Sequence, residues 1–186
     1  MSKVGKKVIF KSQDIENSLK RIAGEIVKKN GSMEDVVLVG IRTGGAFLAK
    51  RLQEFISRLG LPEPPTGVLD ITLYRDDWTR IGSAPTVGKT ELPFSIDNKT
   101  IILIDDVLFT GRTIRAAMDA LIDFGRPKRI ELAILVDRGD NDRELPIQAN
   151  YVGGVWNISP YETINVYLQE GGYEDHVTIE RKKRAA

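Results

Sequence analysis

Two adjacent carboxylates, Asp105 and Asp106, follow four apolar residues, Ile101–Ile104, and lead into a polar turn, Val107–Thr113. A short apolar run of this kind is typical of a strand buried on both faces. Ligands of α/β sheets bind beside the carboxyl ends of the strands. We therefore expect the two carboxylates and the turn to contact a polar ligand.

The turn has the composition of a phosphate cradle. Its backbone N–H groups and the hydroxyls of Thr110 and Thr113 would face the positive end of the helix that follows. Gly111 permits a close approach of the backbone, and Arg112 can add positive charge. The two carboxylates suit neighbouring ribose hydroxyls, because each accepts two hydrogen bonds. A sugar phosphate satisfies both halves, whereas the plain alternative is a solvated Asp-Asp turn with a threonine helix cap.

Three amphipathic helices and four buried strands are predicted around this segment. The helices are Ser12–Asn30, a stretch with the face Leu48, Leu52, Phe55 and Leu59 that stops at Gly60, and Arg112–Phe124. The strands are Val36–Val39, Val68–Tyr74, Thr100–Ile104 and Ile130–Val136, with a loop at Gly40–Gly45. Strands that alternate with helices predict an α/β fold, a mostly parallel sheet flanked by helices.

The rest of the chain has a different pattern. Arg75–Pro93 is long, polar and rich in glycine and proline, which is typical of a functional loop. Three short β-like pieces without helices between them are interpreted as a small β cap, or hood, plus a closing strand: Tyr151–Val155, Ile164–Leu168 and Val177–Ile179. We expect one domain over residues 1–186, with a core at about 12–137 and the hood and closing strand at 138–180.

Composition excludes several classes of protein. Charge is balanced, with 27 Lys and Arg against 26 Asp and Glu, so no global field attracts nucleic acid or an anionic membrane. The absence of cysteine excludes disulfides, thiolate metal sites and cysteine nucleophiles. No signal-peptide core or membrane span is evident. We expect a cytoplasmic protein without a membrane partner.

The string Ile101–Thr113 resembles the motif with which type I phosphoribosyltransferases bind phosphoribosyl pyrophosphate (PRPP). The likeness is most extensive to the PyrR type, uracil phosphoribosyltransferases that also control pyrimidine operons by transcription attenuation. The segments that resemble PyrR signatures, in the same order, are Leu38–Gly45, Leu69–Asp77, Phe124–Pro127, Leu135–Gly139 and Arg143–Ile147. The resemblance implies the type I phosphoribosyltransferase fold and covers about Ser12 to Ile147.

The resemblance also implies roles for individual residues. Arg75, Asp76 and Asp77 would begin a loop that closes over PRPP, and Arg75, Asp76, Asp105 and Asp106 would be the catalytic residues. The implied PRPP and nucleotide contacts are Arg42, Thr43, Gly44 and Gly45 at the pyrophosphate, then Asp105, Asp106, Val107, Leu108, Phe109, Thr110, Gly111, Arg112, Thr113 and Arg138. Mg²⁺ is implied as the cofactor that PRPP carries, and Asp105 and Asp106 would meet it there.

The implied reaction joins uracil to the ribose 5-phosphate of PRPP and yields UMP and pyrophosphate. Purine-using relatives carry an acidic residue where Phe109 stands, which favours a pyrimidine here. Arg138 would lie near the base, and Trp156 would either stack on it or pack in the core. The expected partners are PRPP, uracil, UMP and further copies of the chain in a dimer or tetramer.

Two rival hypotheses keep the fold. One is a UMP-sensing, RNA-binding regulator of pyrimidine operon attenuation with weak or no catalysis, and the other is an enzyme for a different base. Departures from the family weaken the first: Gly24 and Asp140–Asp142 stand where histidines are expected, and Gly153–Gly154 replaces a Gly-Lys pair, although Arg143 remains. Lost positive charge weakens RNA binding, so we expect weak or absent attenuation. Val155–Ser159 also differs from the family, which leaves the base open.

Overall fold

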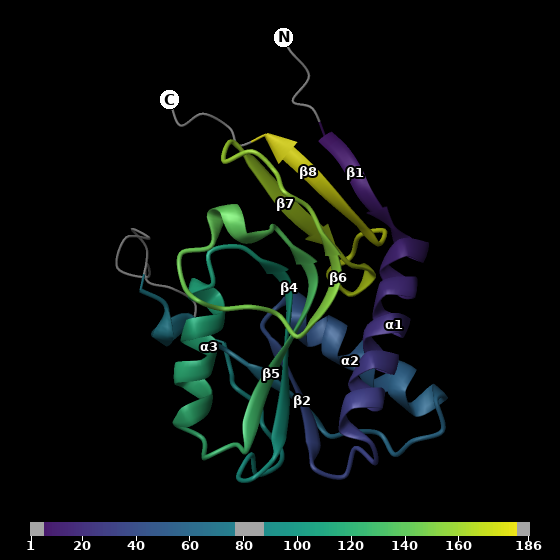
Figure 1. Cartoon of the computed structure of the whole chain (residues 1–186), viewed down its shortest axis with the longest axis vertical. Coiled ribbons are helices and arrows are strands. Elements are labelled where there is room, and N and C mark those ends of the chain that lie inside the picture. The colour runs from purple at the N-terminus through teal and green to yellow at the C-terminus, as the bar shows by residue number, and fades with distance from the viewer. Residues whose placement is uncertain (1–5, 77–87, 182–186) are drawn as a thin grey trace.

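The computed structural model describes residues 6–76 and 88–181 and is built around a five-stranded parallel sheet (Figure 1). The strands have the order β3-β2-β4-β5-β6, and all neighbours in it are parallel. In this order they cover Thr66–Leu69, Val36–Ile41, Thr100–Leu108, Arg129–Asp137 and Tyr151–Val155. The alternation of strands and helices therefore predicted the class of sheet correctly.

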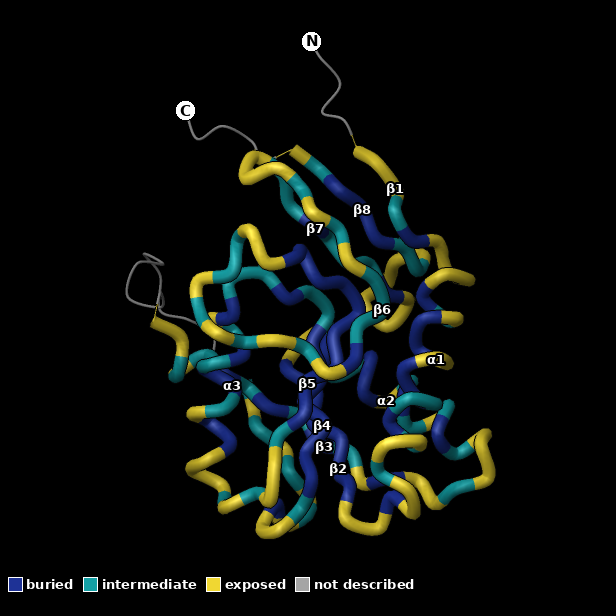
Figure 2. Tube along the Cα trace, in the orientation of Figure 1, coloured by how far each residue is buried: buried dark blue, intermediate teal, exposed yellow. Residues whose placement is uncertain are grey.

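Helices cover both faces of this sheet. Helices α1 (Ser12–Asn30) and α2 (Gly44–Arg58) lie on one face, and α3 (Arg112–Ile122) lies on the other (Figure 1). Side chains alternate along β4, so Ile102 joins the core under α1 and α2 while Leu103 joins the core under α3. Figure 2 shows the central strands buried along most of their length. The sheet is a rigid layer between two cores.

A small antiparallel sheet lies beyond one end of the main sheet (Figure 1). It consists of β1 (Lys6–Lys11), β8 (His176–Arg181) and β7 (Glu162–Tyr167), with β8 in the middle. Short 3₁₀ turns are η1 (Thr72–Tyr74), η3 (Asp140–Asp142) and η4 (Gln169–Gly171). Two features differ from the prediction. No strand was predicted at β1, and Tyr151–Val155 was assigned to the hood, whereas as β6 it is the edge strand of the main sheet.

The structure corrects two strand predictions. Val68–Tyr74 is not one strand: β3 ends at Leu69, and a 3₁₀ turn follows because the Asp70 carboxylate accepts a hydrogen bond from Thr72 N at 2.9 Å. The strand expected over Thr100–Ile104 continues to Leu108, so both aspartates lie within it.

The second helix also differs from the prediction. The loop expected over Gly40–Gly45 is only Arg42-Thr43, because β2 continues to Ile41 and α2 begins at Gly44. Ile56 completes the buried face of α2, whereas Leu59 is 55% exposed beyond the end of the helix.

Among the described residues, no helix has both the length and the apolar character needed to cross a membrane.

Candidate functional site

A cavity of about 520 Å³ lies beside the carboxyl ends of β2 and β4. Its walls include Arg42, Thr43, Gly44, Asp70, Arg75, Asp105 and Asp106 from the main sheet side, and Val166, Leu168, Gly171 and Tyr173 from the side of the small sheet. Parallel strands bring their carboxyl ends to one edge, which explains why residues far apart in the sequence meet here. The structure thus brings residues of two predicted ligand-binding segments, Arg42–Gly44 and Asp105-Asp106, to one cavity.

A second cavity of about 650 Å³ contains the predicted phosphate turn. Its lining consists of Arg75, Asp76, Val107–Ile114 and Glu144. Both cavities share Arg75, Val107 and Thr113, so they adjoin. The arrangement suits one elongated ligand with anionic groups at both ends.

Hydrogen bonds from outside hold the phosphate turn in place. Gly111 has φ 92° and forms the N-terminal boundary of α3, a conformation that favours glycine. The amides of Glu144 and Leu145 donate to the carbonyl of Thr110 at 3.0 and 3.2 Å. The Thr110 hydroxyl accepts from the amide of Arg112 at 3.3 Å. The start of α3 is therefore preorganised for an anion.

Arg112 is paired with two carboxylates in this structure. Its Nε donates to Glu144 at 2.5 Å, and its Nη1 donates to Asp76 at 2.6 Å. The guanidinium therefore connects the start of the loop after β3 to the turn that follows β5. The sequence suggested that Arg112 contributes positive charge to a phosphate site. In this structure that charge also interacts with Glu144 and Asp76.

The paired carboxylates differ from ordinary surface aspartates. Asp105 is 7% exposed, and its Oδ1 accepts a hydrogen bond from the amide of Asp106 at 3.0 Å. Burial, followed by the negative charge of Asp106, raises the pKa of Asp105 well above its usual value, while the positive charge of Arg75 opposes this rise. Burial also raises the pKa of Asp106. The pair therefore favours a ligand that supplies hydrogen-bond donors or positive charge.

Gly45 permits the close contact between β4 and the segment after β2. A Cβ on Gly45 would lie 2.2 Å from the carbonyl oxygen of Ile104, which is much closer than any van der Waals contact. The peptide bond between Arg42 and Thr43 is cis. Gly45 was predicted as part of a pyrophosphate loop, and here it brings that loop beside Asp105 and Asp106.

Asp70 belongs to the site, although sequence reasoning assigned it no role. Its carboxylate accepts hydrogen bonds from Thr72 N at 2.9 Å and Gly88 N at 3.0 Å, and it lies 4.0 Å from Nε of Arg42. Asp70 thus joins three segments around the first cavity. Its position inside Leu69–Asp77 was the available signal. The predicted site residues Arg75 and Asp76 line the cavities, whereas Asp77 lies outside the described residues.

Arg138 is 3% exposed and supports Phe109 from behind. Its guanidinium lies 3.7 Å from the centre of the Phe109 ring, donates to Asp142 at 2.9 Å and donates to the carbonyl of Glu162 at 3.3 Å. Phe109 lines the second cavity, and Arg138 lines neither. In this structure Arg138 makes a cation–π contact with Phe109, and the base contact expected of it stays a prediction.

Trp156 packs against Phe10, with ring centres 4.6 Å apart in an edge-to-face arrangement. It lines neither cavity, so its position agrees with the core-packing alternative. A Cβ on Gly154 would lie 2.2 Å from the Trp156 ring. The glycine that replaces the expected lysine therefore makes room for the tryptophan.

The positions tied to RNA binding fall in two places. Arg143, whose side chain is 9% exposed, donates to Asp137 at 2.7 Å and to the carbonyl of Phe109 at 2.5 Å, so it supports the site from inside. Arg21, one turn before Gly24, donates to the carbonyl of Gly153 at 2.8 Å. The departures on α1 and β6 therefore lie near one another.

The described residues contain no group of three or more His, Cys, Asp or Glu that could hold a metal ion. Asp105 and Asp106 are nonetheless hard oxygen donors, and burial is the main cause that raises the pKa of each. This donor set fits a divalent cation that arrives already bound to a ligand, and Asp105 and Asp106 would meet it.

Comparison with known proteins agrees with these features. A family model described as "Phosphoribosyl transferase domain" matches residues 6–170. Two curated proteins named "Bifunctional protein PyrR" are each 50% identical to the chain. The one from Syntrophobacter fumaroxidans aligns over 181 residues, 97% of this chain and 96% of the relative. The one from Thermus thermophilus aligns over 177 residues, 95% of this chain and 97% of the relative.

Solved structures with a similar fold include two hypoxanthine phosphoribosyltransferases. The Trypanosoma cruzi enzyme has a TM-score of 0.69 at 17% identity and covers 95% of this chain and 97% of its own. The Staphylococcus aureus enzyme has a TM-score of 0.66 at 24% identity and covers 96% of this chain and 93% of its own. At these identities the likeness concerns the fold.

Proposed function

The chain belongs to the phosphoribosyltransferase family, and within it to the PyrR type, and from this premise we propose that it converts uracil and PRPP into UMP and pyrophosphate. One observation carries the proposal. The cavity beside β2 and β4 combines the buried Asp105 and the half-buried Asp106 with the segment Arg42–Gly44. Ribose hydroxyls need strong acceptors, and a diphosphate needs amides and positive charge, so PRPP satisfies both.

PRPP would bind across the two adjoining cavities. Its 5-phosphate would lie in the turn Val107–Thr113, its ribose hydroxyls would donate to Asp105 and Asp106, and its diphosphate would lie against Arg42–Gly45. A ring nitrogen of uracil then forms a bond to the anomeric carbon as the bond from that carbon to the diphosphate oxygen breaks, and the proton of that nitrogen passes to water or to the departing pyrophosphate. The electron pair of the broken bond leaves with pyrophosphate.

The residues of this chain promote the reaction by position and charge. The carboxylates hold the ribose while positive charge develops on it, and Arg75 lies where both cavities meet. Mg²⁺, when bound with PRPP, supplies charge neutralisation for the diphosphate. Catalysis here requires no nucleophilic side chain, because the base is itself the nucleophile.

Phe109 and its support favour a pyrimidine as the base. The side chain at position 109 is a phenyl ring, with Arg138 against one face, so this position offers no carboxylate to the polar edge of a purine. We therefore assign uracil, with Phe109 as an apolar wall and Arg138 acting through it.

A second function is favoured by the name of the curated relatives, which describes them as bifunctional. The chain would then also bind RNA and regulate pyrimidine genes. We expect this activity to be weak, because Arg143 is internally paired and Gly24 and Gly153–Gly154 carry no charge. PRPP, uracil and UMP are the proposed small-molecule partners, and a dimer or tetramer is the proposed assembly.

The test is a panel of bases incubated with the protein, PRPP and Mg²⁺, with release of pyrophosphate as the readout. Uracil should give UMP, and hypoxanthine and guanine should give little product. Product from a purine and none from uracil would refute the base assignment. Filter binding of pyrimidine-leader RNA over a range of salt concentrations tests the second function, and submicromolar, UMP-dependent affinity would reverse our ranking.

A further inference from the structure

One wall of the first cavity comes from the loop Leu168–Asp175, which joins β7 to β8 and is called here the β7–β8 loop. Gly171 and Tyr173 of this loop line the same cavity as Arg42–Gly44. Tyr173 is 57% exposed, so its ring and hydroxyl are accessible from solvent. An exposed tyrosine beside a polar cavity can contact a ligand there through its ring and its hydroxyl.

A single arginine of α2 holds the β7–β8 loop. Arg51 donates to both carboxylate oxygens of Glu170, at 2.7 and 2.5 Å, and to both of Asp175, at 2.5 and 2.9 Å. Asp175 in turn accepts from the amide of Gln169 at 2.8 Å. The Arg51 side chain is 14% exposed, so water screens these pairs less than it screens surface pairs.

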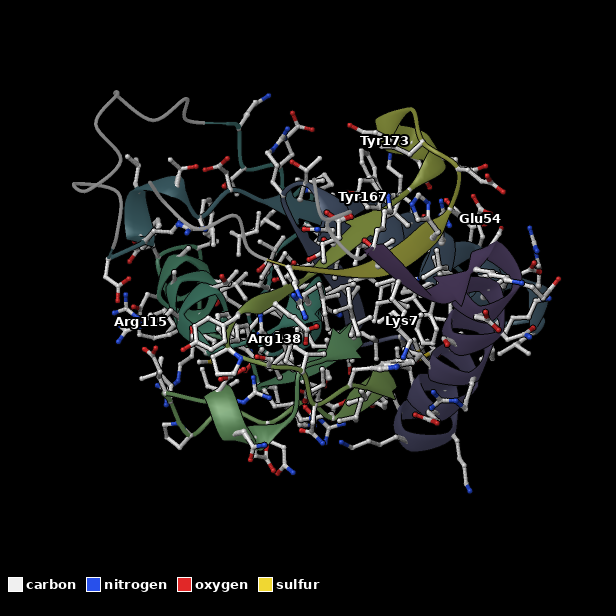
Figure 3. The ribbon with its side chains drawn as sticks, turned by 90° about the horizontal axis from the view of Figure 1, so that it is seen from above. Lys7, Glu54, Arg115, Arg138, Tyr167 and Tyr173 are labelled. Carbon is white, nitrogen blue, oxygen red and sulfur yellow. The ribbon has the colours of Figure 1, made fainter. Side chains whose placement is uncertain are left out.

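The position of Arg51 along α2 connects this loop to the other wall. Helix α2 begins at Gly44, which lines the cavity, and Arg51 lies two turns further along the same rigid element. The helix therefore fixes the distance between the segment Arg42–Gly44 and the β7–β8 loop. Tyr173 of the loop packs edge-on against Tyr167 of β7 with ring centres 5.2 Å apart, and Tyr167 stacks on His176 of β8 at 4.6 Å. Figure 3 shows Tyr167 and Tyr173 side by side on this part of the molecule.

We propose that Tyr173 contacts the diphosphate half of PRPP and that Arg51 is the positioning residue that holds Tyr173 there. This inference rests on the proposed function, because it takes the ligand in this half of the cavity to be a diphosphate. A phenol hydroxyl donates well to a phosphate oxygen, and the ring excludes water from the reacting centre. Arg51 acts only through the loop, since its own donors are engaged by Glu170 and Asp175.

Steady-state kinetics of Tyr173→Ala and Arg51→Met test the proposal. Each variant should raise the KM for PRPP about fivefold or more, as expected for a lost hydrogen bond, while the KM for uracil stays within about twofold. Arg51→Lys keeps the charge without the double bidentate contact, so it should restore part of the loss. Arg58→Met is the matched control on the same helix, because Arg58 is exposed at the end of α2 and pairs with Glu54 one turn earlier, and it should match the wild type.

The double variant Tyr173→Ala with Arg51→Met separates positioning from general damage. If Arg51 acts through Tyr173, the double variant should be no worse than the poorer single variant. Additive losses, or a rise in the KM for uracil equal to that for PRPP, would overturn the proposal. Because Tyr173 lies on the surface, its variant remains informative even if Arg51→Met does not fold.

Calorimetric titration with pyrophosphate and Mg²⁺ distinguishes this inference from the proposed function. Wild-type protein that makes UMP, together with variants that bind pyrophosphate normally, would refute the role of Tyr173 and leave the function intact. Wild-type protein that makes no UMP, with weaker pyrophosphate binding in both variants, would refute the function and support the contact.

Discussion

A Cβ placed on Gly44 would lie 2.6 Å from Oδ2 of Asp106. Gly44, the first residue of α2, thus packs so closely against the Asp106 carboxylate that a methyl group on Gly44 would not fit between them. The contact connects the segment proposed for the diphosphate to the carboxylate proposed for the ribose. A change at one should therefore be felt at the other.

Gly44→Ala is expected to weaken PRPP binding by about tenfold, or roughly 1.4 kcal/mol, because the methyl group displaces the Asp106 carboxylate. The fold should persist, since the tip of a side chain can move. Gly45→Ala is the contrasting variant: its Cβ would meet a backbone carbonyl at 2.2 Å, so overpacking should cost about 1–3 kcal/mol of stability. Calorimetry with PRPP and thermal unfolding measure the two effects. If Gly44→Ala and Gly45→Ala lowered the stability equally, the distinction between the two positions would be wrong.

Asp105→Asn is expected to stabilise the ligand-free protein at neutral pH and to abolish PRPP binding. The folded protein raises the pKa of Asp105, so the stability contributed by its protonated form is fully present below about pH 4 and is lost as pH rises through the folded pKa. Asparagine has no charge to bury. The melting temperature of the variant should exceed that of the wild type by a few degrees at pH 7.5, and the gap should narrow at pH 4.5. A difference in melting temperature that does not change with pH would contradict a buried charge on Asp105.

Arg143→Met is expected to destabilise the protein by about 3–5 kcal/mol, because it removes the charged partner of the buried Asp137 carboxylate and leaves it only the amide of Gly139 as a donor among the described residues. Denaturant unfolding measures this loss, with the exposed Arg126→Met as the control. If instead the stability is unchanged and RNA affinity falls, Arg143 serves RNA binding and our view of its role is wrong.

Phe109→Leu is expected to raise the KM for uracil more than the KM for PRPP and to cost about 1–2 kcal/mol of stability, because Arg138 loses its aromatic partner. Phe109→Tyr keeps the ring and should behave like the wild type. Initial rates with each substrate varied in turn provide the measurement. An effect confined to PRPP would place Phe109 away from the base.

Much of the main sheet was readable from the sequence, because strands buried on both faces appear as short apolar runs such as Ile101–Ile104. The turn before α3 was also predictable, because Thr110, Gly111 and Thr113 follow the two aspartates in a specific order. The small sheet was harder. β1 pairs with β8 across almost the whole length of the chain, and the apolar run of β1 is too short to reveal this partnership.

The contacts made by charged side chains were the least predictable part of the site. Arg138 was predicted to contact the nucleotide, and Arg143 was tied to RNA binding. The sequence did not reveal their internal ion pairs, because only the fold determines that Asp142 and Asp137 lie within reach. Asp70 gave no periodic signal, because its role depends on Gly88, which lies 18 residues further along the chain. Long-range pairs of this kind follow from tertiary structure.

The most direct test of the account is a crystal structure of the protein with UMP and Mg²⁺. We predict that the phosphate lies within hydrogen-bonding distance of the amides of Val107–Thr113 and that the ribose hydroxyls donate to Asp105 and Asp106. UMP bound elsewhere, with that turn in contact with solvent alone, would contradict the account.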